Sequence, residues 1–172
     1  MAITSKLNVK PGKLDPFARA VLRELNKRVA IGIPGDSMHT AEPGEKPISN
    51  AVIGYLSEGG APDQNIPQRP HLVPGVESIR EQAAARLKKA AEQAFLGDLE
   101  APEKALHAIG LLGVAAVQRE ITDGTFAPLS ERTLEARRAR GRTGEKPLID
   151  TSQYRRSIQY VVLRRNLVDD HQ

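Results

Sequence analysis

With 172 residues, of which 40% are hydrophobic but only 3% aromatic, the chain is long enough for one domain whose core consists mainly of Leu, Ile, Val and Ala. It contains no cysteine, which excludes a disulfide framework and a thiolate metal site. A net charge of +4 permits contact with nucleic acid or an acidic protein surface without requiring either.

No apolar stretch near the N-terminus resembles a secretion signal, and none in the chain approaches the roughly 20 residues needed to cross a bilayer. We therefore expect a soluble protein that is made in the cytoplasm and has no membrane partner. Residues 1–13 lack periodicity and predict a flexible arm. Residues 14–165 predict one folded domain, and residues 166–172 a polar tail.

Asp15 and Pro16 predict the start of the first helix, as N-cap and first helical residue. Apolar residues then recur at three- and four-residue spacing as far as Val29, and charged residues such as Glu24 mostly fall on the other face. From Val29 to Ile33 the apolar residues alternate, which predicts a strand.

Residues 34–49 carry prolines and glycines among polar side chains, and predict a long loop of the kind that often binds a partner. Asp36, Ser37 and His39 on this loop are candidates for a hydrolase, but they lack the sequence context of a nucleophile elbow or an oxyanion hole. Asp36 and His39 would also be half a metal site without a further ligand nearby. We therefore expect no catalytic residue, no metal and no cofactor.

Asn50 is suited to cap a short helix that the glycines at 59 and 60 would end. In the segment 65–72, two prolines three residues apart favour extended geometry and predict a stiff strap. Arg69 lies between these prolines. It is either a solvated surface arginine or one that is held in place to pair with a carboxylate of a neighbouring subunit.

Residues 75–96 and 102–123 predict two amphipathic helices, which we expect to form a hairpin through Gly97. Small residues of the second helix, among them Gly110 and Gly113, would let another helix approach closely. Its apolar face is expected to comprise Leu106, Ile109, Gly113, Ala116, Val117 and Ile121.

Ser130 predicts the N-cap of a third helix. This helix opens the densest positive patch of the chain, which comprises Arg132, Arg137, Arg138, Arg140, Arg142 and Lys146. Because no aromatic residues are interleaved with these cations, a solvated or intersubunit basic face is a better interpretation than a nucleic-acid motif.

Residues 150–152 have short polar side chains suited to capping a turn, and from Ser157 onward the apolar residues alternate as in a strand with one buried face. The chain therefore predicts an α+β fold, in which several helices pack against a small antiparallel sheet with long extended loops. The sheet includes strands near 29–33 and 157–164. We expect the core to include Ile149, Ile158, Tyr160 and Val162.

The run KPLIDTSQYRRSIQYVV at 146–162 resembles the C-terminal signature KPLxDTGxLRxSIxYxV of phage neck proteins, the head-tail joining or tail-completion family to which the lambda minor tail protein Z is related. NIPQRPHL at 65–72 resembles that family's xIPxRPFL, and PLSERTLEARRARG at 128–141 resembles its PLSxxTxxxKxxxG. The three stretches follow the family's order. Ser152 replaces the usual glycine, Tyr154 the usual leucine and His71 the usual aromatic residue.

This resemblance, which spans roughly residues 50–163, implies a structural virion protein of a tailed bacteriophage without enzymatic activity. Such a protein would form a ring in the neck, as a hexamer or dodecamer. It would join the head-side connector or head-closure protein to the tail tube or tail terminator protein, with genomic DNA crossing its lumen. Candidate interface residues are Arg69, Arg132, Arg137, Arg138, Arg140, Arg155 and Arg156. The alternative is a basic accessory protein that binds nucleic acid.

Overall fold

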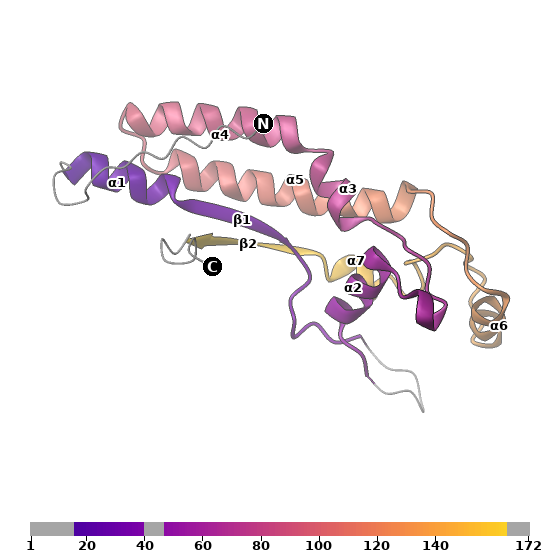
Figure 1. The fold of residues 1–172 in the computed structure, drawn as a ribbon. Coiled ribbons are helices and arrows are strands. Elements are labelled where there is room, and N and C mark those ends of the chain that lie inside the picture. Colours follow the sequence, from indigo (N-terminus) through magenta and orange to yellow (C-terminus); the bar gives the residue numbers. More distant parts are fainter. Residues whose placement is uncertain (1–15, 40–46, 165–172) are drawn as a thin grey trace.

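The computed structural model describes residues 16–39 and 47–164. The expected arm (1–13), the expected tail (166–172) and the expected cap Asp15 lie outside these residues. The fold is α+β, as predicted, and pairs one long helical hairpin with a two-stranded antiparallel sheet (Figure 1). In chain order its elements are α1 (Pro16–Leu25), β1 (Lys27–Gly32), α2 (Asn50–Gly59), a 3-10 turn (Pro62–Gln64), α3 (Leu72–Glu77), α4 (Arg80–Phe95), α5 (Ala101–Asp123), α6 (Glu131–Ala139), α7 (Gln153–Arg156) and β2 (Gln159–Arg164).

Helix α5 is the centre of the molecule, with α4 along one side and the β1–β2 ribbon along another (Figure 1). All six residues of the predicted apolar face of α5 are buried. The hairpin through Gly97 is also confirmed. In the sheet, Val29 pairs with Val162 and Ile31 with Tyr160. None of the described helices is both long enough and apolar enough to cross a membrane.

The glycines of α5 admit the strands instead of the helix that we expected. A Cβ atom on Gly110 would lie 2.2 Å from the ring of Tyr160, and one on Gly113 would lie 2.1 Å from Cδ1 of Ile31. Ile158, which is 2% exposed, lies in one core cluster with Val117, Ile121 and Tyr154. Of the other predicted core residues, Ile149 packs against this cluster, and Tyr160 and Val162 are half-buried.

Helix α1 ends at Leu25, before the predicted limit, and Glu24 is buried although its spacing predicted an outward position. Lys27 explains this, because its Nζ contacts the carboxylates of Glu24 and, at 2.6 Å, Glu103 on α5. The hydrogen bond to Glu103, followed by that to Glu24, raises the pKa of Lys27. A charge cluster therefore ties the α1–β1 junction to α5.

The helix predicted at 75–96 is broken into α3 and α4. Gly75 of α3 packs so closely on α5 that a Cβ atom there would lie 2.7 Å from Cα of Val117. After this contact the chain changes direction at Ser78, whose hydroxyl donates to the Gly75 carbonyl at 2.7 Å. The cap of α2 also differs from the prediction: Ser49 Oγ accepts from the Ala51 N–H, and Asn50 is the first helical residue.

Candidate functional site

The three stretches that resemble the neck family meet at one place, where the strap 65–72, the segment before α6 and the segment before α7 come together. Arg69 joins the first two. Its Nε donates to the carbonyl of Ala127 and its Nη2 to that of Pro128, each at 2.9 Å. We call this region the joint. Arg69 therefore has partners within its own chain, where we had considered a solvated arginine or one that pairs with the next subunit.

Arg137 of α6 holds the approach to α7. It is buried, and its Nη1 donates to the carbonyls of Gly144 at 2.7 Å and Lys146 at 3.0 Å. Asp150 lies 3.7 Å from its Nε and also pairs with Arg142 at 2.7 Å. Arg137 therefore does not belong to a solvated basic face, because its buried guanidinium completes the hydrogen bonding of a loop.

His71 and Tyr154, two of the positions that depart from the family's pattern, contact each other in the core. Their rings lie 5.4 Å apart, edge to face, and His71 Nε2 is hydrogen-bonded to the Tyr154 hydroxyl. Nδ1 lies 2.7 Å from the carbonyl of Arg69, which can only accept. A neutral ring therefore carries its proton on Nδ1, and Tyr154 donates to Nε2. Burial, and secondarily the charge of Glu58, raises the pKa of Tyr154.

Glu58 on α2 fixes the start of α3. Its carboxylate accepts from the backbone N–H groups of His71 at 2.8 Å, Leu72 at 2.9 Å and Val73 at 2.9 Å. Burial alone would raise the pKa of Glu58, but these three donors lower it below its usual value. A carboxylate remote in sequence thus satisfies N–H groups that a helix N-terminus leaves unpaired.

The turn into α7 differs from the prediction. The expected caps do not act as caps: Ser152 makes no side-chain cap bond, and Thr151 Oγ1 is buried without a hydrogen-bond partner among the described residues. Instead Ser152 has a φ of 61°, in the left-handed region that glycine adopts without strain. The position at which the neck family has glycine is thus one whose backbone conformation favours glycine.

The remaining candidate arginines are distributed over the surface near the joint. Arg138 pairs with Glu131 at 2.7 Å, and Arg155 Nη1 lies 3.2 Å from Thr122 Oγ1. Arg132, Arg140 and Arg156 are exposed. Carboxylates therefore pair with part of the basic run at 132–146, and backbone carbonyls accept hydrogen bonds from Arg137, which weakens the run as a nucleic-acid site.

The loop residues considered for a hydrolase are separated by an amide. Asn50 Nδ2 donates to Ser37 Oγ at 3.0 Å, and its Oδ1 lies 3.2 Å from His39 Nδ1. Asp36 is exposed. Within residues 16–39 and 47–164 no group of three or more His, Asp or Glu side chains could hold a metal ion. Asn50 therefore links the 37–39 segment of the loop to the start of α2.

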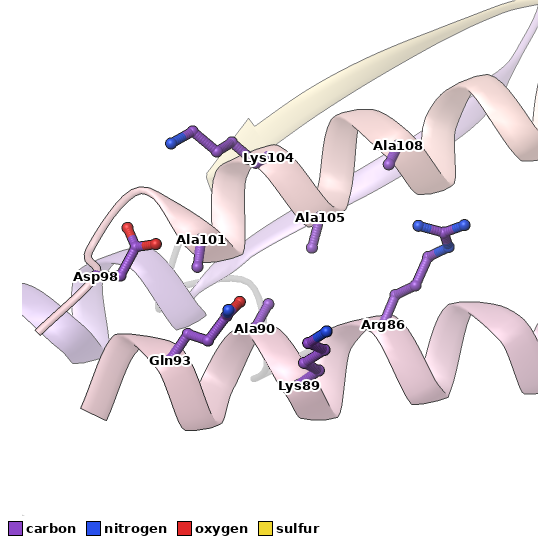
Figure 2. Close-up of a pocket in the computed structure, with 9 residues that line it drawn as sticks. All are labelled: Arg86, Lys89, Ala90, Gln93, Asp98, Ala101, Lys104, Ala105 and Ala108. Carbon is purple, nitrogen blue, oxygen red and sulfur yellow. The ribbon is translucent and has the colours of Figure 1, made fainter. Parts of the chain in front are cut away.

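A groove of about 390 Å³ lies between α4 and α5 (Figure 2). Four alanines line it, and so do Arg86 and Lys89 of α4, of which Arg86 extends into the space between the helices. Lys104 on α5 pairs with Glu100 at 2.8 Å. The complete lining is Arg86, Lys89, Ala90, Gln93, Asp98, Ala101, Lys104, Ala105 and Ala108, which includes no serine, threonine, tyrosine or histidine.

Comparisons of the chain with protein-family models, with curated proteins and with solved structures find no match. Function must therefore be inferred from the residues of the chain itself.

Proposed function

We propose that this chain is a structural protein of the neck of a tailed bacteriophage, where copies form a ring that joins the head connector to the tail tube. The observation that carries the proposal is the joint. Three stretches that resemble the neck family, as far apart as residues 69 and 146, meet through hydrogen bonds from Arg69 and Arg137 to backbone carbonyls.

Two details add support. The left-handed Ser152 stands where the family has glycine, and the two other departures, His71 and Tyr154, contact each other. Paired departures at a contact are expected when one packing solution replaces another. The proposed protein acts through its surfaces, with further copies, the head connector or head-closure protein and the tail tube or tail terminator protein as partners in the virion.

The test is assembly. Size-exclusion chromatography with light scattering should give a mass of several copies, and negative-stain images should show rings with a central opening. Antibody against the chain should label the junction of head and tail in virions. The proposal would be refuted if the chain stayed monomeric at high concentration and the antibody labelled no virion.

The alternative, a nucleic-acid-binding accessory protein, predicts a gel shift whose affinity falls steeply as salt rises. It is less well supported, because Arg137, Arg138 and Arg142 of the expected patch already have partners within the chain.

A further inference from the structure

Helix α2 presents an apolar surface to solvent. Ile48, Val52 and Tyr55 are exposed. Val52 and Tyr55 are three residues apart on one face of the helix, and Ile48 lies two residues before its start. Tyr55 is the most prominent of the three, with 80% of its surface exposed. We call these residues the α2 stripe. A convex row of this kind suits a concave partner.

A concave apolar surface lies where the end of α1, the start of β1, α4 and α5 meet. This groove has a volume of about 560 Å³. Val29 and Leu106 line it, and Leu25 and Leu87 line it while remaining exposed. We call it the α1–α4 groove. It is large enough to take side chains such as those of the stripe.

The charges beside these two surfaces are opposite. Asp36 follows Gly35, whose carbonyl accepts from Ser49 Oγ at the start of α2 at 3.2 Å, and Asp63 lies in the 3-10 turn that follows α2. Both are exposed. Arg28 and Lys88 line the groove, are also exposed, and form no ion pair with any described residue. An apolar contact between stripe and groove would therefore be flanked by complementary charges.

The two surfaces lie at opposite ends of β1 (Figure 1). Lys27 to Val29 border the groove, whereas the chain leaves Gly32 toward α2. A strand of six residues is about 20 Å long, so a copy cannot place its stripe in its own groove. We propose that the α2 stripe of one copy binds the α1–α4 groove of the next copy.

This inference rests on the proposed ring and names the contact that would close it. Because the two contacting surfaces are different, the contact is heterologous, and repeated copies form a ring when the rotation closes.

Disulfide cross-linking tests the contact. The sequence contains no cysteine, so only the introduced cysteines can form the cross-link. Full-length Tyr55→Cys mixed with full-length Leu87→Cys should form a disulfide-linked dimer, and the double variant should form a ladder of oligomers. Leu111→Cys replaces Leu87→Cys in the matched control, since Leu111 is exposed but lies outside both surfaces. Equal cross-linking in the control, or none in either mixture, would overturn the contact.

Charge reversal provides a second test. Arg28→Glu with Lys88→Glu should weaken self-association about tenfold or more, because like charges then face each other across the contact. Adding Asp36→Lys and Asp63→Lys should restore it. Lys89→Glu with Arg119→Glu, which changes the net charge equally at exposed sites outside the groove, should have little effect.

Circular dichroism must show that each variant is folded. Rings that survive the Arg28 and Lys88 reversal unchanged would refute this contact but leave the ring itself standing. A parent chain that is monomeric and shows no cross-link would refute both.

Discussion

Along α5 the chain packs apolar side chains into space left by glycines, whereas at the joint it packs guanidinium and carboxylate groups against backbone carbonyl and N–H groups. Tyr160 and Ile31 lie over Gly110 and Gly113 in the first region. Arg137 and Glu58 bond to the backbone of segments 7 and 14 residues further along the chain in the second. The first region gains stability from burial that depends little on direction, and the second from directional bonds that specify where each segment lies.

The largest effect is expected in the apolar region. Ile158→Asp would bury an unpaired carboxylate at a site that is 2% exposed, and should cost more than about 4 kcal/mol of unfolding free energy, enough to prevent folding. Solubility and circular dichroism measure this. Val161→Asp, at an exposed position of β2, which begins one residue after Ile158, is the matched control and should stay folded. An Ile158→Asp chain as heat-resistant as the parent would contradict the core assignment.

Arg137→Met tests the joint. It removes the donors for the Gly144 and Lys146 carbonyls and leaves part of the Asp150 carboxylate unpaired, which should cost about 2–4 kcal/mol. Urea unfolding gives the value. Arg132→Met, an exposed change on the same helix, should stay within about 0.5 kcal/mol of the parent. Equal stabilities of the two variants would show that Arg137 does not hold the loop.

The pair His71 and Tyr154 separates directional bonding from packing within one contact. Tyr154→Phe leaves the buried Nε2 of His71 without its donor and should cost about 1–3 kcal/mol. His71→Phe combined with Tyr154→Leu, the residues of the family's pattern, should recover most of that loss, since replacing both partners by apolar groups can be nearly neutral. A double-mutant cycle of His71→Phe and Tyr154→Leu, with both single variants, checks this by urea unfolding, and strictly additive losses would exclude coupling.

The smallest effect concerns Glu58 and pH. Its pKa in the folded chain lies below its usual value of 4.5, so its contribution to stability is present above pH 4.5 and is lost as pH falls through the lower, folded value. The melting temperature of the parent should therefore exceed that of Glu58→Gln at pH 6, with the difference shrinking toward pH 3. A difference that is constant over this range would rule out the carboxylate as the cause.

The apolar periodicity of the sequence was enough to predict the α+β class, the hairpin and the buried face of α5. A repeat of 3.6 or of two residues places the apolar side chains on one face of a helix or strand, and that face is the one buried on folding. Ser130 as a helix cap is confirmed for a similar local reason, since its Oγ accepts from the Thr133 N–H three residues away.

The joint was missed for two reasons. Some of its bonds join residues far apart in the sequence, such as Arg69 and Pro128, and others reach a loop whose geometry the sequence does not indicate, such as Arg137 to Gly144. Arg69 and Arg137 were interpreted as interface cations, since nothing near them in the sequence indicates which carbonyls they reach. The burial of Glu24 and the break between α3 and α4 also depend on contacts with α5 that no local pattern contains.

By itself, then, the sequence determined most of the elements and of the faces that turn inward, since these follow from the spacing of apolar residues along one helix or strand. Only the tertiary structure decided which polar side chains serve the backbone of distant segments and which apolar side chains remain exposed on α2 and beside α4. The physical reason is that hydrogen bonds and grooves depend on the positions of atoms that folding alone brings together.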